Sequence, residues 1–541
     1  MPYGIALDLG TSGFRSHLVD LDRKAKILST AITVRHPLPG ANIMDHMHFW
    51  MTSGREITHR IIVETIGDLI ALYGKDNLKQ VTKVSVCGNP IQLSLFEDIE
   101  IRDLAFAGKS KLKSLGVVSP DRKGGVRNVG EIGIPGLDPE ADVIIPPAIR
   151  HEIGADALAM IIKSGLLERK ETCMVTDYGT NAEMALNVDG EIYTGSAAAG
   201  PAMEGQSVEM GMLASPGAIS DLEYEFQWRC MVLNEEMIPM PGDKIDLGTG
   251  YVVEEGDMHG KAVGITGTGV VAAVAAAMHG NMWKKGRLAG GSLRLQDGVT
   301  ITSNDISETC KAIGAIRAGH FTLMEHAGIG FADMKEMIMS GASGTYVDAE
   351  KAREVGMVPP LCQDIYQIGN TSLAMATDII RRPELLDELQ GIADSIRSNH
   401  VMFATDKVFE EIYIQELGYW EEGMTMETYN RNLRTAGIQE LPKPKGVPNV
   451  HRIVVRDIPV LGDLGLHLFE DIGTELTAEF EGCTLCYNCV EECPEDALLF
   501  RDRTAVVLTK NCLGTACGRC QLKCPEKVFK YGELRISEAD L

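Results

Sequence analysis

Short apolar runs that end on an acidic residue give this chain its clearest hydrophobic pattern. Residues 3–20 contain such a run, then a glycine-rich turn, and then a second strand-like run. Residues 173–187 repeat the same order. Two strand-like runs around a short turn predict a β-hairpin. The pattern therefore predicts two hairpins, each with an acidic residue just before its turn.

Apolar residues spaced three or four positions apart predict helices in several other segments. These lie at residues 55–73, 152–164, 270–278 and 306–316, and as a series of amphipathic helices from 373 to about 417. Further strands are expected at residues 81–87, 337–340 and 451–460. We expect Asn304 or Asp305 to be the N-cap of the helix at 306–316. Residues 106–143, rich in Gly, Pro and Lys, predict surface loops, and residues 440–449 predict a linker stiffened by prolines.

Length and charge narrow the class of protein. The chain has 541 residues, which is too long for one hydrophobic core and predicts two to four domains. Its formal net charge of −25 argues against a nucleic-acid-binding protein, whose surface must be basic to meet phosphates. The most apolar helical stretch, residues 269–278, is too short to cross a membrane, and the first residues enter a strand without a charged leader. We therefore expect a cytoplasmic protein that binds neither nucleic acid nor a membrane.

The turns of the two predicted hairpins share the pattern Asp-x-Gly-Thr-[Ser/Asn]. Its residues are Asp8, Gly10, Thr11 and Ser12 in the first copy, and Asp177, Gly179, Thr180 and Asn181 in the second. Backbone N–H groups of such turns bind anions, and a neighbouring carboxylate can reach Mg²⁺ through its waters. One copy alone would fit an ordinary β-turn. Two copies in the same context predict an internal repeat that grips the phosphates of a nucleotide, with Asp8 and Asp177 as the catalytic carboxylates.

Three segments rich in small residues are further candidates for nucleotide contacts. Residues 194–205 allow a ligand to approach the backbone closely, but tight domain packing would need the same residues. Residues 264–269 lead into a helix whose N-terminus can bind an anion or a ribose. Residues 341–345 form a second glycine turn. The residues that we assign to cofactor binding here are Glu204, Gly267, Thr268, Gly341 and Gly344.

Two cysteine runs lie near the C-terminus. The first has the spacing C-x2-C-x2-C-x3-C-P, which is typical of bacterial iron–sulfur ligation, and the second keeps its ending but opens with a four-residue gap. In such runs the proline turns the chain away and the last cysteine binds the other cluster. The predicted sets are Cys483, Cys486, Cys489 and Cys524 for one cluster, and Cys512, Cys517, Cys520 and Cys493 for the other. Eight thiolates are enough for two [4Fe–4S] clusters.

Other uses of these cysteines fit less well. Zinc sites prefer two separated C-x2-C pairs, and disulfides are rare in a reducing compartment. The longer Cys512–Cys517 spacing also occurs in plant-type two-iron sites, which leaves the type of the second cluster open.

Some residues that could bind metals have simpler interpretations. The other cysteines lie in apolar contexts and are expected to be buried thiols. They are Cys87, Cys173, Cys230, Cys310 and Cys362. His46 and His48 would point the same way on a strand, but no third ligand is evident, and a structural role is favoured.

The chain resembles the reductive activators of corrinoid proteins, which have the sugar kinase–heat-shock–actin ATPase fold. The matching motifs appear in the family's order over about residues 1–400. They are Asp8–Ser12, Asp177–Glu183, Ala198–Gly205, Gly264–Gly269, Gly314–Gly319 and Gly369–Leu373. Two places depart from the family pattern, because Ala182 replaces a glycine and residues 341–344 replace a Gly-Gly-Phe-Gly-like adenosine turn. The C-terminal two-cluster module resembles that of activases serving methylamine methyltransferases of methanogens.

The resemblance implies an α/β protein with a two-lobed, actin-like ATPase fold and a C-terminal α+β ferredoxin-like domain. We expect one lobe at 1–165, the other at 166–400, a helical segment with the linker at 401–475, and the ferredoxin-like domain at 476–541. The implied activity is ATP-dependent transfer of one electron from the clusters to Co(II), which restores Co(I). The implied cofactors are two [4Fe–4S] clusters and ATP with Mg²⁺. The implied partners are a corrinoid protein of a methyltransferase system and an upstream low-potential electron donor.

Two other functions share part of this pattern. Activators of radical acyl-CoA dehydratases have the same fold, but they hold one cluster between two subunits and lack an eight-cysteine tail. A non-enzymatic electron carrier with a docking scaffold would bind no nucleotide. Iron content separates the first alternative from the favoured function, and ATP affinity separates the second.

Overall fold

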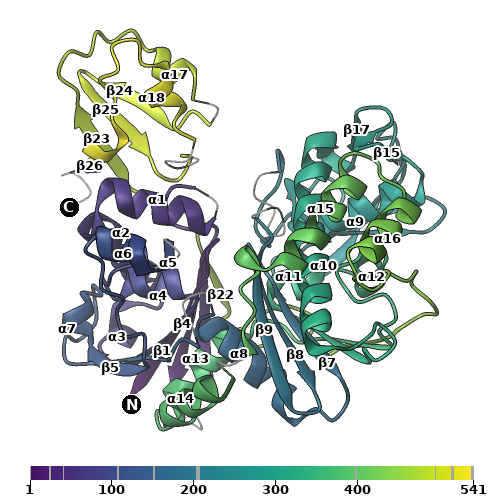
Figure 1. Ribbon diagram of the computed structural model, residues 1–541. Helices are drawn as coiled ribbons and strands as arrows, with labels where there is room; N and C mark the ends of the chain where they lie inside the picture. The colour runs from purple at the N-terminus through teal and green to yellow at the C-terminus, as the bar shows by residue number, and fades with distance from the viewer. Residues whose placement is uncertain are drawn as a thin grey trace. The chain divides into compact units, whose positions relative to one another are not determined.

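The computed structural model describes residues 2–22, 26–40, 42–105, 109–149, 153–200, 202, 208–396, 399–493, 495–512, 514 and 517–537. The chain forms two compact units, whose elements are labelled in Figure 1. Unit 1 comprises Met1–Ala155, Met375–Gly391 and Val460–Leu541, and unit 2 comprises Asp156–Ala374 and Ile392–Pro459. The chain therefore returns to unit 1 twice. The four domain ranges given above stay a prediction.

Unit 1 is built on a seven-stranded sheet with strand order β22-β3-β2-β1-β4-β6-β5. The strands are β1 (Tyr3–Leu9), β2 (Phe14–Asp20), β3 (Lys26–Thr33), β4 (Val81–Gly88), β5 (Gly125–Asn128), β6 (Asp142–Ile145) and β22 (Leu466–Phe469). The helices before residue 155 are α1 (Ile43–Ser53), α2 (Arg55–Ala71), α3 (Lys75–Leu78), α4 (Pro90–Phe96), α5 (Arg102–Ala105), α6 (Lys109–Ser114) and α7 (Val129–Ile132). β1 pairs antiparallel with β2 and parallel with β4, so the first predicted hairpin lies at the centre of the sheet.

Unit 2 contains a six-stranded sheet with strand order β21-β20-β19-β7-β8-β9. Its strands are β7 (Cys173–Tyr178), β8 (Asn181–Val188), β9 (Glu191–Ala198), β19 (Glu336–Ser340), β20 (Asp364–Gln367) and β21 (Asn449–Arg452). The main helices are α8 (Ala155–Lys163), α9 (Gly267–His279), α10 (Ser303–Ala327), α11 (Gly341–Tyr346), α12 (Ala349–Val355), α15 (Lys407–Trp420) and α16 (Met426–Thr435). α13 (Thr371–Arg381) and α14 (Leu385–Ile396) lie where the chain passes between the units.

A second sheet in unit 2 has the order β13-β12-β11-β10-β14. Its strands are β10 (Ala218–Tyr224), β11 (Trp228–Leu233), β12 (Pro239–Ile245), β13 (Val252–Glu254) and β14 (Gly264–Ile265). Gly264–Ile265 leads through Thr266 into α9, nearly all of whose residues are buried. α10 packs along the same core, so the small residues of both helices allow close packing.

The two large sheets repeat one strand order. β3-β2-β1-β4-β6 in unit 1 corresponds to β9-β8-β7-β19-β20 in unit 2. In each set three antiparallel strands are followed by strands that run parallel to the first of them. The internal repeat predicted from the two hairpins is confirmed by this topology.

The cysteine-rich residues form a small four-stranded sheet within unit 1, with order β24-β25-β23-β26. The elements are β23 (Glu475–Glu479), α17 (Asn488–Glu491), β24 (Leu498–Arg501), β25 (Thr504–Leu508), α18 (Arg519–Lys523), the 3-10 helix η6 (Tyr531–Glu533) and β26 (Arg535–Ile536). Figure 1 shows this sheet, coloured yellow, beside α1 of the same unit, and residues of η6 contact α1. This mixture of short strands and helices is the α+β domain expected from the sequence.

Several local predictions are wrong. Residues 106–143 were expected to be loops, but within them α6 and β5 are regular, and β6 pairs with both β4 and β5. The N-cap of α10 is Thr302, because Asp305 is its partner in a capping box. Residues 341–345 begin α11 instead of forming a turn. Of residues 451–460, only the first two belong to a strand, β21.

His46 and His48 lie on α1, a helix, and not on a strand. Because a helix places neighbours two positions apart on different faces, His46 is buried and His48 is exposed. The five scattered cysteines are buried, as predicted.

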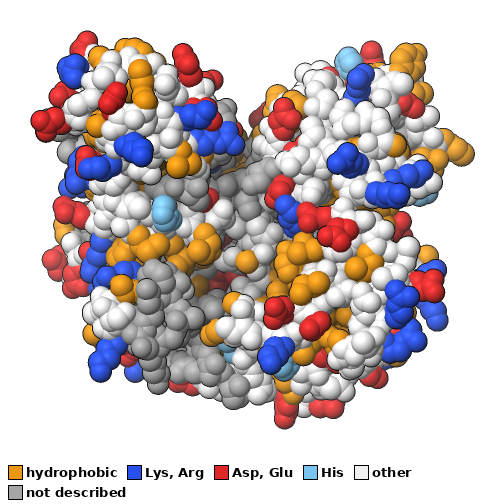
Figure 2. Space-filling model, turned by 45° about the horizontal axis from the view of Figure 1, so that its top comes forward, with side chains coloured by type: hydrophobic (Ala, Val, Ile, Leu, Met, Phe, Trp, Pro, Cys, Tyr) orange, Lys and Arg blue, Asp and Glu red, His pale blue; other side chains and the backbone are white. Residues whose placement is uncertain are grey.

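Acidic side chains outnumber basic ones, 76 to 51, which gives the negative net charge. On the face shown in Figure 2, side chains of both signs are interspersed with apolar ones. None of the helices in the described ranges has the length and apolar character needed to cross a membrane.

Candidate functional site

The turn after β1 is held by hydrogen bonds within unit 1. Gly10 donates its backbone N–H to the carbonyl three residues later at 3.1 Å, which closes the turn. The Thr11 hydroxyl is buried and accepts a hydrogen bond from Asn89 Nδ2 at 3.0 Å. Asp8 is also buried, and its carboxylate lies 3.7 Å from a guanidinium nitrogen of Arg15. The predicted phosphate residues Asp8, Gly10, Thr11 and Ser12 therefore belong to one braced turn.

The matching turn in unit 2 follows β7, where the Asp177 carboxylate accepts a hydrogen bond from the Ser340 hydroxyl at 3.1 Å. Gly341 lies against the same carboxylate, since a Cβ atom on Gly341 would be 2.3 Å from Asp177 Oδ1. Its φ of +78° also favours glycine. Two predicted site residues from distant parts of the sequence, Asp177 and Gly341, are thus brought together. Gly344 lies one turn further along α11, packed on Tyr178 and Met339.

Glu183 is a member of this site that was not assigned from the sequence. It pairs directly with Asp177 across the β7–β8 hairpin. Burial, and then the negative charges of Asp156 and Asp177, raise the pKa of the Glu183 carboxyl well above its ordinary value. The Ser196 hydroxyl donates to Glu183 Oε1 at 3.3 Å. This register corresponds to a three-residue turn centred on Thr180, and that turn length would have been the signal for the pairing.

The structure places two other residues predicted to bind nucleotide, Gly267 and Thr268, at the start of α9. Thr268 is buried, and its hydroxyl donates to the backbone carbonyl of Ser220 at 2.9 Å, while Thr266 is the N-cap of α9. Gly267 is buried in the first turn of that helix. Thr268 therefore braces the N-terminus of α9 against β10. The assignment of Gly267 and Thr268 to nucleotide binding stays a prediction. Glu204 lies outside the described residues.

Four cysteines of the ferredoxin-like domain line one cavity, together with aromatic side chains that include Tyr487. They are Cys483, Cys486, Cys489 and Cys524. Leu485 and Tyr487 have φ values of +54° and +61°, so the backbone between the cysteines loops back on itself. Such a loop can aim several sulfurs at one point. This donor set fits a four-iron cluster, and it is the set predicted for the first cluster.

The other four cysteines also lie together. Burial is the main cause that raises the pKa of Cys512 and of Cys520. The charges of Cys493 and Cys517 add to it at Cys512, and those of Cys512 and Cys517 add to it at Cys520, so these four thiols are near one another. Backbone N–H groups already donate to two of these sulfurs, from Ala497 to Cys493 at 3.2 Å and from Gly514 to Cys512 at 3.4 Å. N–H···S bonds of this kind tune cluster potentials. The crossed assignment of Cys493 and Cys524 thus matches the two groups.

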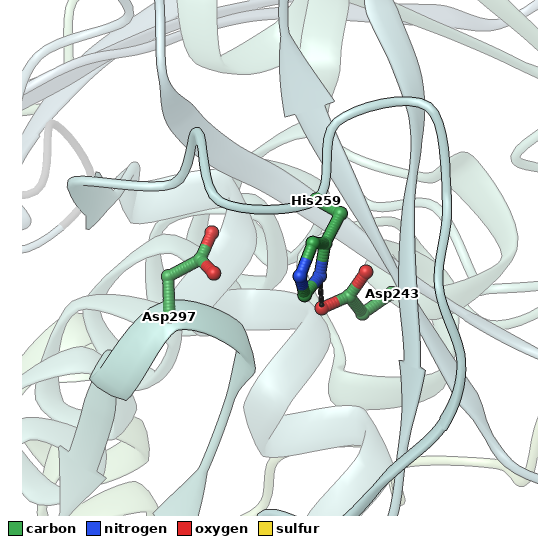
Figure 3. A group of neighbouring side chains, drawn as sticks. All are labelled: Asp243, His259 and Asp297. Carbon is green, nitrogen blue, oxygen red and sulfur yellow. Dashed lines mark hydrogen bonds and ion pairs between the residues drawn. The ribbon is translucent and has the colours of Figure 1, made fainter.

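A third group of possible metal ligands lies in unit 2. Asp243, His259 and Asp297 place their ligand atoms within 4.8 Å of one another, and Figure 3 shows the His259 ring between the two carboxylates. Asp243 Oδ2 is 2.8 Å from His259 Nδ1. The two Asp297 oxygens accept backbone N–H groups from Gly260 and Ala262. These bonds fasten the loop that carries His259 to Asp243 of β12 and to Asp297 of the 3-10 helix Gln296–Gly298, so we assign the group a structural role.

Comparisons with known proteins agree with this arrangement. Two family models match, "RACo middle region" over residues 3–169 and "C-terminal domain of RACo the ASKHA domain" over residues 171–430. A "[Co(II) methylated amine-specific corrinoid protein] reductase" of Methanosarcina barkeri is 47% identical over 521 residues, which cover 95% of this chain and 96% of that protein.

The chain belongs to the family of reductive activators of corrinoid proteins.

Another relative of this reductive activator is the "Corrinoid activation enzyme RamQ" of Eubacterium limosum, which is 25% identical over 467 residues, 78% of this chain and 71% of that protein. A solved structure of a "Reductive activator for corrinoid,iron-sulfur protein" superposes with a TM-score of 0.62 at 22% identity, over 76% of this chain and 65% of that one. The family and the repeated sheets confirm the predicted actin-like fold class.

Proposed function

We propose that this reductive activator uses ATP to drive the reduction of an inactive Co(II) corrinoid protein to Co(I), with the electron passing through two [4Fe–4S] clusters. The convergence of eight cysteines into two groups of four carries the proposal. An N-terminal lobe of the ATPase fold belongs to the same compact unit as both groups. Electron transfer and nucleotide binding are thereby joined in one chain.

The client that we propose is the corrinoid protein of a methylamine methyltransferase system. The support is the 47% identity to a reductase whose name specifies a methylated amine-specific corrinoid protein, along nearly the whole of both chains. A low-potential electron donor upstream is required by the chemistry, because each electron given to cobalt must be replaced. We further propose that the protein acts in the cytoplasm.

The residues of the two turns would bind the phosphates of ATP. Backbone N–H groups around Gly10 and Gly179 would donate to phosphate oxygens, and Asp8 and Asp177 would hold the waters of Mg²⁺. Burial and the charges of Asp156 and Asp177 raise the pKa of Glu183, so this carboxyl is ionised less readily than an ordinary one and repels a phosphate near Asp177 less strongly.

The redox step transfers one electron to Co(II), which becomes Co(I), and ATP is hydrolysed to ADP and phosphate. When bound, the clusters supply one-electron transfer at low potential. The eight cysteines would hold them, and the backbone N–H groups that donate to Cys493 and Cys512 would help to set their potentials. Nucleotide binding would favour a state in which the corrinoid protein is reduced more readily. Such coupling requires a part of the protein with two conformations whose populations depend on both the nucleotide and the corrinoid protein.

The testing experiment mixes the reduced protein with ATP, Mg²⁺ and the Co(II) form of a methylamine corrinoid protein. We expect the visible spectrum of Co(I) to appear with ATP and not without it. Asp8→Ala and Asp177→Ala should abolish ATP hydrolysis and leave the iron content unchanged. Absence of ATP-dependent Co(I) would refute the function, and full ATPase activity in both variants would refute the phosphate assignment.

Iron analysis discriminates against the dehydratase-activator alternative. Two four-iron clusters require about eight irons per chain, whereas one cluster shared by two subunits requires about two. A count near two would favour the alternative. A lack of measurable ATP affinity would favour the electron-carrier alternative.

A further inference from the structure

A path of buried polar groups runs through unit 1 from the first phosphate turn toward the second group of cysteines. It starts at Thr11, whose hydroxyl accepts a hydrogen bond from Asn89 Nδ2 at 3.0 Å. Asn89 is the N-cap of α4, and its Oδ1 accepts the backbone N–H of Gln92 at 2.9 Å. The Gln92 side chain is completely buried and lies between two histidines.

The hydrogen bonds of Gln92 fix where the two histidines carry their protons. His36 Nδ1 accepts the backbone N–H of Leu38 at 3.1 Å, so His36 Nε2 is the nitrogen that donates to Gln92 Oε1 at 2.9 Å. Gln92 Nε2 can then donate to His46 Nδ1 at 2.8 Å. The rings of His36 and His46 are stacked with their centroids 4.0 Å apart. The array is therefore directional, and its hydrogen bonds require both rings to be neutral.

Both histidines belong to segments that contact the cysteine-bearing domain. Two residues beyond Leu38, Gly40 donates its backbone N–H to the carbonyl of Cys512 at 2.9 Å. On α1, which carries His46, the Phe49 ring meets the Tyr531 ring edge-on, with centroids 6.3 Å apart. The Tyr531 hydroxyl lies 3.2 Å from Cys512 Sγ. The path thus ends at Cys512, a proposed cluster ligand, and at Tyr531, the hydrogen-bond partner of the Cys512 sulfur.

We propose that Gln92, together with Asn89, is a positioning residue that couples nucleotide binding at the Thr11 turn to the environment of the second cluster. The inference rests on the proposed function, since it takes Thr11 as a phosphate-binding residue and Cys512 as a ligand. If the Thr11 hydroxyl turns toward a phosphate, the Asn89 amide loses its partner, and the buried array beyond it must rearrange. His46 Nε2 is buried without a hydrogen-bond partner among the described residues, so a second arrangement can gain a bond there.

The expected consequence is that nucleotide changes the potential and the spectrum of the second cluster, because hydrogen bonds near the sulfurs set both. Gln92→Met tests this, since methionine has a similar volume but makes neither side-chain bond. Asn89→Ser is a second variant, because serine keeps the N-cap of α4 but is too short to reach Thr11. The matched control is Tyr73→Phe, which removes a buried hydrogen bond to Ser16 in the same unit but away from the path.

The experiment uses the holoprotein of full length. Iron per chain and ATP affinity are measured first, and then the EPR spectrum and midpoint potentials of the reduced clusters with and without a non-hydrolysable ATP analogue and Mg²⁺. We expect a nucleotide-induced change in wild type and in Tyr73→Phe, and its loss in Gln92→Met and Asn89→Ser, with iron content preserved and ATP still bound at saturating concentration. ATP stimulation of Co(I) formation should fall by about tenfold, within the 5–150-fold range of typical coupling.

A Gln92→Met or Asn89→Ser protein that keeps the full nucleotide-induced change would overturn the inference. Wild-type protein that binds clusters and ATP and forms Co(I), but shows no nucleotide-induced change, would overturn the inference and leave the proposed function intact. Wild-type protein without clusters or without ATP affinity would overturn both.

Discussion

Arg317 of α10 and Glu416 of α15 form an ion pair inside unit 2, with Arg317 Nε 2.7 Å from Glu416 Oε1. The Glu416 side chain has no solvent exposure, and Tyr429 donates its hydroxyl to the same carboxylate. Gly314, one turn before Arg317, packs against Glu416, so the family motif Gly314–Gly319 is explained here by helix packing. The pair connects the two helices that pack most extensively in this unit.

Glu416→Gln is expected to destabilise unit 2 strongly. The change leaves a buried guanidinium without its counter-charge, which costs about 3–5 kcal/mol. Urea unfolding of the holoprotein, followed by circular dichroism, measures the loss. The matched control is Glu308→Gln on α10, the helix that carries Arg317. The half-exposed pair of Glu308 with Lys311 contributes about 1 kcal/mol or less. Equal losses in the two variants would contradict a special role for the buried pair.

Gly341→Ala is expected to weaken ATP binding by at least about tenfold, because a free-energy change of 1.4 kcal/mol already has this effect. The added Cβ would lie 2.3 Å from the Asp177 carboxylate and would displace it. Isothermal titration with ATP and Mg²⁺ measures the affinity. Gly328→Ala is the control, since φ there is +67° but no atom lies within 4 Å of the new methyl group. Both variants carry the backbone penalty of about 1–2 kcal/mol, and only Gly341→Ala should lose affinity.

Acid should destabilise the fold below pH 6.5, because several histidines are buried in the neutral form. Burial lowers the pKa of His36 and of His320 to about 3. Their folded-state pKa lies below the unfolded value of 6.5, so the unfolded chain binds more protons between pH 6.5 and 3. The stabilisation is therefore complete above pH 6.5 and decreases as the pH falls, by up to about 1.4 kcal/mol per pH unit for each histidine.

Unfolding free energies between pH 8 and 5 test this pH dependence. His320→Gln should reduce the slope of unfolding free energy against pH, because it removes one of the buried histidines. The glutamine can still hydrogen-bond to Thr176. His48→Gln, at an exposed position of α1, should leave it unchanged. A stability that is constant down to pH 5 would show that these rings do not stay neutral.

The crossed ligands make a prediction about pairs of variants. Cys524→Ser should alter the same EPR signal as Cys486→Ser, and Cys493→Ser should alter the same signal as Cys517→Ser. Each variant should retain about four of eight irons if its cluster is lost. Grouping of Cys524→Ser with Cys517→Ser would mean that each run fills its own cluster.

The features that the sequence predicted correctly are those encoded over short stretches. The hairpin at residues 3–20 was predicted to within one residue, because its strands and its glycine turn are adjacent in the chain. Cys483, Cys486, Cys489 and Cys524 were expected together from the general pattern of such cysteine runs, and they line one cavity, while their role as cluster ligands stays a prediction.

The features that were missed depend on short elements or on distant partners. β5 and β6 have four residues each, too few for a periodic pattern, and β6 is held by pairing with β4. The contact of Gly341 with Asp177 joins residues far apart in the chain, as does the array of Gln92 and His36. Long-range contacts of this kind follow from the assembled sheets and have no signature in the local sequence.

The crossed arrangement of the cysteines also bears on how the protein is made. Under the proposed ligand sets, the first cluster lacks its fourth ligand until Cys524 has been synthesised, and the second requires Cys512–Cys520. Translation must therefore pass Cys520 before the second cluster can be completed and Cys524 before the first can be. A ribosome that stops after the first cysteine run would release a chain with four thiols that belong to two different sites. Completion of both clusters is thus confined to chains in which Cys524 has been synthesised.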